Sequence, residues 1–248
     1  MTHTKREKGS TTKSKKWILR HVIVLIIATI IGYLFLISRA EWSAMHRYNR
    51  AIGDVSLILV AAAMVIGPLT RLIRKKWLRA LLPYRRELGI WAVVAASIHL
   101  LIILIGWVEL DLWRLFGFEF HPGLQRYVMI LHGFALANAV GIIALLYGLA
   151  LALTSNDFSQ RRLGPSVWKF VQQGSYILWW LVILHTAYFL YVHFLDFHRE
   201  TPEPNWAQWP FAGLVMAVML VQMAATIKTW RQKQTRERTP THGIRNTN

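Results

Sequence analysis

Apolar residues in this chain gather in long runs that alternate with short polar segments. Six windows have the roughly 18 to 25 apolar residues that a helix needs to cross the hydrocarbon core of a bilayer. The predicted spans are residues 21–38, 51–70, 88–108, 127–153, 170–192 and 210–227. None of them alternates like a strand, and backbone in lipid must satisfy its own hydrogen bonds. The pattern therefore predicts an all-α integral membrane protein, a bundle of six transmembrane helices.

The basic residues predict how this bundle is oriented. The chain carries 29 Lys and Arg against 12 Asp and Glu, a net charge of +17. The N-terminus holds seven of the 29, residues 71–86 seven, residues 161–169 three and the C-terminal tail six, and only six lie on the opposite side. Because cytoplasmic loops are enriched in Lys and Arg, both termini are expected in the cytoplasm. Nucleic acid is not an expected partner, because the basic residues separate apolar spans and do not cover a soluble face.

Three segments are expected along the chain: basic cytoplasmic tails at residues 1–20 and 228–248, and a six-span domain at residues 21–227. The polar composition of residues 1–16 and 228–248 predicts disorder. Residues 1–40 resemble a signal peptide, but their apolar core of about 16 residues is longer than usual, which favours an uncleaved anchor. Only about twenty residues follow the sixth span and no glycine-rich nucleotide-binding motif occurs, so we expect no soluble nucleotide-binding domain.

The residues that the chain lacks narrow its chemistry. Cysteine is absent, which excludes disulfides, iron–sulfur clusters, thiolate ligation of haem and cysteine nucleophiles. The HExxH and GxSxG motifs are also absent, so nothing supports a hydrolase. A metal in this protein must be held by histidine, carboxylate or methionine.

Two histidines stand deep in spans that run in the same direction. His99 lies ten residues after Gly89, about 15 Å into the helix and near the bilayer midplane. His185 lies 21 residues after Gly164, about 31 Å along, so the two depths match only if residues 165–169 lie along the interface and the span is tilted. An ionisable residue at such a depth is a functional hypothesis by default. Two imidazoles on parallel helices suit the iron of a six-coordinate b-type haem, so both histidines are predicted metal ligands.

Further candidates leave alternatives open. His132, near the outer end of the fourth predicted span, lies at a depth similar to that of His185 and forms a rival pair with it. Arg85 and Arg86 are candidates for binding haem propionates, an anionic flavin or a partner protein. Their alternative role is ordinary anchoring to lipid phosphate at the cytoplasmic interface.

Similar segments head the two spans that carry these histidines: RRELG at residues 85–89 and RRLG at residues 161–164. The headers, the histidine placement and the six spans resemble the ferric-reductase-like transmembrane family. Within it, the chain is most similar to the haem-binding membrane subunits of bacterial periplasmic methionine sulfoxide reductase systems. The stretches that carry the resemblance are GPLTRLIRKKWLRALLPYRRELGIWAVVAASIHLL and LALTSNDFSQRRLGPSVWKFVQQGSYILWWLVILHTAYFLY. They cover spans two to five.

The family's two motifs are loose, and their order and spacing carry the likeness. The RR-x-LG…H pattern falls on Arg85, Arg86, Leu88, Gly89 and His99, and the LG…W…Y…H pattern on Leu163, Gly164, Trp168, Tyr176 and His185. Relatives often carry another histidine four residues after the tryptophan, where this chain has Gln172. Since glutamine supplies no imidazole, two alternatives remain: a single haem, or His132 as a local replacement.

The resemblance implies electron transfer through haem b across a bacterial inner membrane. Electrons would come from a cytoplasmic flavin reductase, through FMN, or from membrane quinol, and would pass to an extracytoplasmic oxidoreductase subunit, a molybdenum-containing one in the most similar relatives. The chain would then be an electron-transfer component of an oxidoreductase. The alternative is a non-redox membrane scaffold or small-molecule transporter whose histidines only bond helices together. A self-contained ferric reductase would need a fused flavin domain.

Overall fold

The computed structural model describes residues 3–129, 134–193 and 206–238. Within these ranges six helices are long and apolar enough to cross a membrane, which confirms the predicted all-α bundle. The elements in chain order are α1 (His3–Ile37), α2 (Ala44–Leu72), α3 (Lys76–Ala80), α4 (Tyr84–Gly106), α5 (Leu112–Leu115), β1 (Phe118–His121), β2 (Arg126–Met129), α6 (Phe134–Thr154), α7 (Asp157–Gln173), α8 (Ser175–Ala187), the π-helix η1 (Tyr188–Val192) and α9 (Gln208–Arg238).

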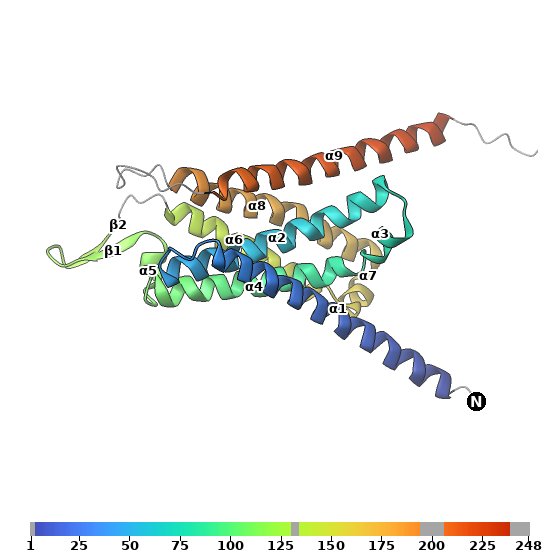
Figure 1. The fold of residues 1–248 in the computed structure, drawn as a ribbon, viewed down its shortest axis with the longest axis horizontal. Helices are drawn as coiled ribbons and strands as arrows, with labels where there is room; N and C mark the ends of the chain where they lie inside the picture. The colour runs from blue at the N-terminus through green and yellow to red at the C-terminus, as the bar shows by residue number, and fades with distance from the viewer. Residues whose placement is uncertain (1–2, 130–133, 194–205, 239–248) are drawn as a thin grey trace, which may run out of the picture.

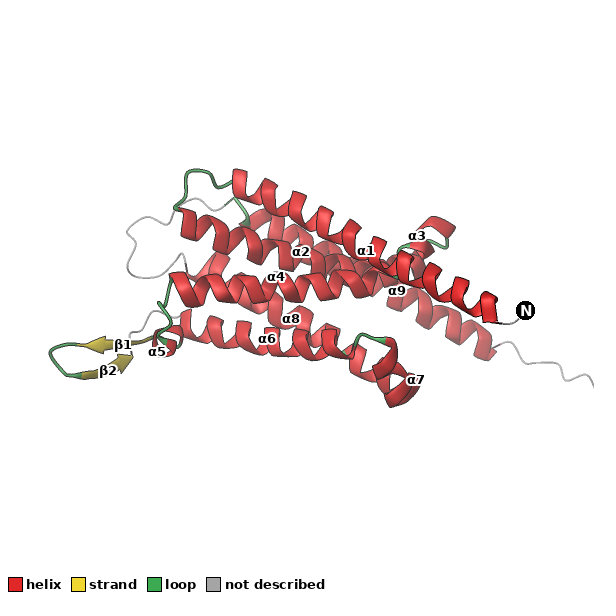
Figure 2. Ribbon diagram, turned by 90° about the horizontal axis from the view of Figure 1, so that it is seen from below, coloured by secondary structure: helices red, strands yellow, loops and turns green. Residues whose placement is uncertain are grey.

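The long helices lie side by side along one axis (Figures 1 and 2). We call one end of the bundle the hairpin end, where α4 ends, α6 begins and β1 and β2 project. The other is the tail end, where α1 begins, α9 ends and α3 and α7 lie. α4 packs most extensively on α2, and α8 on α6. These antiparallel couples, the α2–α4 pair and the α6–α8 pair, are the units on which the site is built.

The core of the bundle lies between helices from both pairs and α9. Its buried side chains include Leu59 of α2, Ala92 of α4, Trp179 of α8 and Val218 of α9, each about 1% exposed. The outward faces of α4, α6, α8 and α9 carry exposed leucine, isoleucine, valine or methionine. An apolar surface of this kind is stable only when lipid covers it. The structure is that of a multi-pass membrane protein.

The fourth span begins later than predicted. Residues 127–129, expected at its start, belong to β2, and α6 begins only at Phe134. β2 pairs with β1 in an antiparallel hairpin whose last register pair joins His121 to Arg126. Tyrosine, valine and phenylalanine favour strands, and the residues between the strands supply a Pro-Gly turn. The apolar character of Tyr127 to Met129 therefore came from a hairpin and not from a membrane helix.

The fifth span is a bent helix in three parts, α7, α8 and η1. Gly164 has φ +77° and ψ 156° inside α7, a conformation that favours glycine, so a new helical segment starts at Pro165. A turn at Gly174, whose backbone stays in the αR region (φ −55°, ψ −15°), separates α7 from α8. α7 lies at an angle to α6 near the tail end (Figure 2). The straight helix that carries His185 therefore begins at Ser175, ten residues before the histidine.

The prediction of disordered tails is wrong for residues 3–16 and 228–238, which are helical. α1 already begins at His3, and α9 continues to Arg238. Extending an existing helix needs no new nucleus, and Lys, Arg, Gln and Glu are good helix formers. The basic tails thus prolong the first and last membrane helices beyond their apolar windows.

Two ion pairs join α1 to the rest of the bundle, one near each end of its apolar part. At the tail end Arg20 Nε lies 2.8 Å from Glu87 Oε1 of α4. At the hairpin end Arg39 Nη2 lies 2.5 Å from Asp54 Oδ2 of α2, and the Arg39 side chain is only 2% exposed. Without α1 the fully buried Glu87 carboxylate would lose Arg20 and be left as an uncompensated buried charge. Arg20 thus ties α1 to α4 at the tail end, and cleavage of residues 1–40 stays untested.

Candidate functional site: a histidine pair between two helix pairs

The structure brings His99 of α4 and His185 of α8 together. Their ring centroids lie 6.3 Å apart, and the ring planes are nearly perpendicular at 87°. Each histidine stands seven residues before the hairpin end of its span, at Gly106 and Val192. The two depths agree because the fifth span is bent at Gly164 and its first part, α7, lies at an angle to α6.

The histidines lie nearer the hairpin end than the midplane position expected from Gly89. α4 begins at Tyr84, directly after Pro83, and not at Gly89. His99 is therefore 15 residues, or about 22 Å, from the tail end of α4 and about 10 Å from its hairpin end.

Each imidazole is held by one backbone carbonyl on the partner helix of its pair. Nδ1 of His99 lies 2.8 Å from the Asn49 carbonyl oxygen of α2, and Nδ1 of His185 lies 2.8 Å from the Ala137 carbonyl oxygen of α6. A carbonyl can only accept, so Nδ1 carries the proton in both rings and Nε2 keeps its lone pair. Within the described residues neither Nε2 has a hydrogen-bond partner. This is the arrangement of metal-binding histidines, whose other nitrogen donates to a carbonyl.

The ring separation provides a test of whether haem fits. A metal–nitrogen bond of about 2.0–2.1 Å, with about 1.1 Å more from nitrogen to ring centre, places two imidazoles on opposite sides of one metal ion about 6.2–6.4 Å apart. The 6.3 Å between His99 and His185 falls in this interval. The ring separation and the donor set of two neutral nitrogens therefore fit a haem iron held between the two histidines.

The other predicted residues lie elsewhere. Arg85 Nε donates to the Ala63 carbonyl oxygen at 3.1 Å, and Arg86 Nη1 lies 3.2 Å from Asp157 Oδ1. Both arginines stand at the tail end, with Arg85 14 residues, or about 21 Å, from His99 along α4. Cofactor binding by either arginine stays a prediction. His132 lies outside the described residues.

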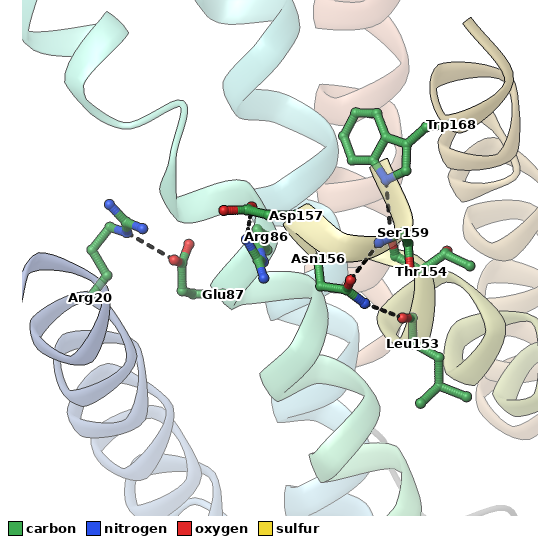
Figure 3. A network of polar contacts seen from close by, with 9 residues as sticks. All are labelled: Arg20, Arg86, Glu87, Leu153, Thr154, Asn156, Asp157, Ser159 and Trp168. Carbon is green, nitrogen blue, oxygen red and sulfur yellow. Dashed lines mark hydrogen bonds and ion pairs between the residues drawn. The ribbon is translucent and has the colours of Figure 1, made fainter. Parts of the chain in front are cut away.

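A buried carboxylate is the residue that the sequence did not single out. Glu87 is fully buried, and only one of its oxygens, Oε1, has a partner, Arg20; Oε2 has none within the described ranges. Figure 3 shows the neighbours Arg86 and Glu87 reaching to opposite sides, to Asp157 of α7 and Arg20 of α1. Glu87 is the only acidic residue in the basic segment 71–108. A single carboxylate among basic residues was the feature of the sequence that could have pointed to Glu87.

Gln172, which stands where relatives often have a histidine, is tied to the end of α6. Its Nε2 donates to Thr154 Oγ1 at 3.1 Å, and its Oε1 accepts from Ser155 Oγ at 3.2 Å. Next to these bonds Trp168 Nε1 donates to the Thr154 carbonyl oxygen at 2.9 Å (Figure 3). At this position the side chain fastens the bend between α7 and α8 to α6.

Fold and site define a class: an all-α multi-pass membrane protein with a histidine pair between two antiparallel helix pairs. The family model for the ferric reductase like transmembrane component matches residues 52–181, more than half of the chain. The chain belongs to this family, which confirms the resemblance. The matched segment includes His99 and ends four residues before His185.

Curated relatives agree with this family assignment. The chain is 29% identical over 185 residues to the protein-methionine-sulfoxide reductase heme-binding subunit MsrQ of Yersinia pseudotuberculosis serotype O:1b (strain IP 31758), covering 75% of this chain and 77% of that protein. It is also 29% identical to the protein of the same name from Yersinia pestis (strain Pestoides F), over 75% and 76% of the two chains. With six membrane spans and bacterial relatives, the chain fits a multi-pass protein of the bacterial inner membrane.

Proposed function

We propose that this protein is a haem b electron-transfer subunit in which His99 and His185 are the axial ligands. One observation carries the proposal: two perpendicular rings 6.3 Å apart, each with Nδ1 bound to a carbonyl and Nε2 left without a partner in the described part of the chain. The family match and the printed name of the relatives, heme-binding subunit, support it. A bound haem iron supplies one-electron oxidation and reduction.

The protein's own residues prepare the site for that role. The carbonyl groups of Asn49 and Ala137 fix the tautomer and direction of the two rings. A hydrogen bond from Nδ1–H to a carbonyl makes the opposite nitrogen a stronger base and hence a stronger ligand. The surrounding apolar helices keep water away, which lowers the local dielectric and influences the redox potential of any group held there.

The position of the pair supports electron flow from the tail end to the hairpin end. The excess of Lys and Arg at the tail end supports a cytoplasmic tail end and an extracytoplasmic hairpin end. His99 and His185 lie about 10 Å from the hairpin end, which favours an electron acceptor outside the membrane. The relatives are named subunits of a methionine-sulfoxide reductase, so the proposed acceptor is an extracytoplasmic oxidoreductase subunit of that kind.

The electron donor would reach the protein from the tail end, as a cytoplasmic flavin reductase with FMN or as membrane quinol. Arg85 stands about 21 Å from His99 along α4, too far for contact with a group held by the histidine pair. We therefore assign Arg85 and Arg86 to an anionic donor at the tail end, where positive charges raise the local concentration of anions.

A second candidate function has one observation in its favour. Both histidines bond a neighbouring helix through Nδ1, as they would in a non-redox scaffold or transporter. That role accounts for the two carbonyl bonds. It does not account for two rings held at the separation and mutual angle of axial ligands, with both Nε2 atoms unpaired among the described residues.

An absorbance spectrum of the purified protein separates the two functions. The haem proposal predicts a Soret band and a sharp alpha band after dithionite reduction, lost in His99→Ala and in His185→Ala. His121, exposed at the end of β1, provides a matched control, and His121→Ala should keep the full spectrum. His132→Ala tests the rival pair. A colourless wild-type protein that folds would establish the scaffold alternative. Loss of the bands in His132→Ala but not in His99→Ala would show that His132, and not His99, is the second ligand beside His185.

A further inference from the structure

Both histidines are held by the same local device. In the α2–α4 pair the carbonyl of Asn49 binds His99, and the residue four positions later is Gly53. In the α6–α8 pair the carbonyl of Ala137 binds His185, and the residue four positions later is Gly141. We call this combination, a carbonyl at position i and a glycine at i+4, a carbonyl–glycine seat.

Helix geometry explains why the glycine is part of the seat. In an α-helix the carbonyl of residue i already accepts from the N–H of residue i+4, and it keeps a second lone pair. Residue i+4 lies on the same face, and its Cβ points back toward the helix N-terminus, over that carbonyl. A side chain at i+4 therefore covers the free lone pair. Glycine leaves it open to a side chain from a neighbouring helix.

The distances show that the imidazoles occupy this open space. A Cβ at Gly53 would lie 3.2 Å from both Cε1 and Nδ1 of His99. A Cβ at Gly141 would lie 2.7 Å from both Cε1 and Nδ1 of His185. Carbon atoms in contact normally stay about 3.5–4.0 Å apart. A methyl group at either position would thus push the ring away from its carbonyl, and more strongly at Gly141.

A third seat shows that the device is not restricted to histidine. Arg85 Nε donates to the Ala63 carbonyl oxygen, and a Cβ at Gly67, four residues later, would lie 3.1 Å from Arg85 Nη1. The seats of His99 and Arg85 on α2 are 14 residues apart, and so are the two side chains on α4. The seat is therefore a way for a flat N–H donor to dock on the neighbouring helix of an antiparallel pair.

We infer that Gly53 and Gly141 are positioning residues that set the strength and orientation of the two axial ligands. This inference rests on the proposed haem function. The glycines do not touch the metal; they act through Nδ1. Losing the Nδ1–H to carbonyl bond makes Nε2 a weaker donor and stabilises ferric iron less, which raises the midpoint potential. Rotating a ring changes the angle between the two imidazole planes.

The experiment uses the full-length, haem-loaded protein with Gly53→Ala and Gly141→Ala. Two glycines supply matched controls. Gly148, seven residues after Gly141 on α6, faces Val93 at 3.0 Å and no histidine, and Gly213 of α9 has nothing within 4 Å. Gly148→Ala disturbs packing near the site without touching the ligands, and Gly213→Ala disturbs nothing. All four variants are compared by redox titration, by EPR of the oxidised haem and by haem affinity.

We expect the midpoint potential to rise in both seat variants and the low-spin EPR signal to move away from the large g value typical of perpendicular imidazole planes. Haem affinity should fall by about tenfold in Gly53→Ala and by up to about 100-fold in Gly141→Ala, the range for partners of ligating histidines. Gly148→Ala and Gly213→Ala should keep the potential and the EPR signal of the wild type. If Gly141→Ala does not accumulate, the inference is tested on Gly53→Ala, whose added methyl group lies farther from its histidine ring.

The possible failures are distinguishable. A wild-type protein that binds no haem would refute the proposed function, and the seats would then have no axial ligands to position. A wild-type protein with a bis-histidine haem whose potential and EPR signal are the same in both seat variants overturns the inference and leaves the proposed function intact. Equal shifts in Gly148→Ala and in the seat variants would also overturn it, because general packing would then explain the effect.

Discussion

The α2–α4 and α6–α8 pairs are alike at the hairpin end and different at the tail end. At the hairpin end each pair holds one histidine on a carbonyl–glycine seat. Fourteen residues farther along α2 the seat at Ala63 and Gly67 holds Arg85. The corresponding residues are Leu151 of α6 and Ser155, directly after α6, and both bond Gln172. The same scaffold thus carries two imidazoles at one end, and a guanidinium and an amide at the other.

This difference shows how one helix-pair geometry serves two purposes. Neutral imidazoles bind iron, whereas a guanidinium has no lone pair to offer and an amide is a poor ligand for haem iron. At the tail end two side chains therefore lie where a second ligand pair could lie, but neither of them can bind haem iron as an imidazole does. Among the described residues one pair of imidazoles is brought together, so we predict one haem for each chain.

The largest expected effect comes from removing a ligand and supplying it again. His99→Gly and His185→Gly should each lose nearly all of the low-spin haem spectrum, because a six-coordinate iron needs both nitrogens. Free imidazole added during haem loading should restore the spectrum in both variants, since the deleted side chain leaves room for it. The measurement is the absorbance of the reduced protein with and without imidazole. Rescue in only one variant would show that the two pairs are not equivalent at the hairpin end.

Placing two histidines at the tail end tests whether its helix pairs have the geometry to hold a second haem. Arg85→His combined with Gln172→His should raise the haem content from about one to about two for each chain, because both positions already lie on carbonyls that can hold Nδ1. The haem-to-protein ratio is measured by the pyridine haemochrome assay. Arg85→Ala with Gln172→Ala is the control and should stay near one. Two haems in the wild type would refute the claim that this end lacks ligands.

The ion pairs beside the headers should differ in strength. Arg20→Ala leaves the fully buried Glu87 carboxylate without a partner and should cost about 3 kcal/mol, near the lower limit for breaking a buried pair, because Arg20 is 25% exposed. Arg86→Ala breaks the exposed pair with Asp157 and should cost at most about 1 kcal/mol. Equilibrium unfolding in mixed micelles measures both. Adding Glu87→Gln to Arg20→Ala should recover most of the loss; no recovery would mean that Arg20 acts by packing.

The smallest effect separates the two header glycines. Gly164 has φ +77° and ψ 156°, a region that is nearly restricted to glycine, so Gly164→Ala should destabilise the protein by about 1–2 kcal/mol. The cost comes from backbone strain alone, because a Cβ there meets nothing within 4 Å. A Cβ at Gly89 also meets nothing within 4 Å, but Gly89 is helical, and Gly89→Ala should stabilise by up to about 1 kcal/mol. The same unfolding assay applies. Changes of equal sign would show that the two headers are one motif after all.

The near repeat of RRELG and RRLG is where sequence reasoning was both useful and limited. The first header does lie at the start of α4, but the second lies inside α7, before the helix α8 that carries His185. They did not reveal that one glycine continues a straight helix while the other breaks one, because glycine permits both conformations. The depths of His99 and His185 could be reconciled only after the break at Gly164 and the turn at Gly174 were located.

The sequence by itself determined the number of membrane spans, the family and the two histidines worth attention. These follow from properties that are local along the chain: runs of apolar residues, the distribution of charge and an ionisable residue inside such a run. The tertiary structure alone decided which carbonyls hold the rings, that Gly53 and Gly141 leave them accessible, and that Glu87 is buried against Arg20. Those contacts join residues 44 to 67 positions apart, and only the packing of one helix on another fixes which side chain meets which backbone atom.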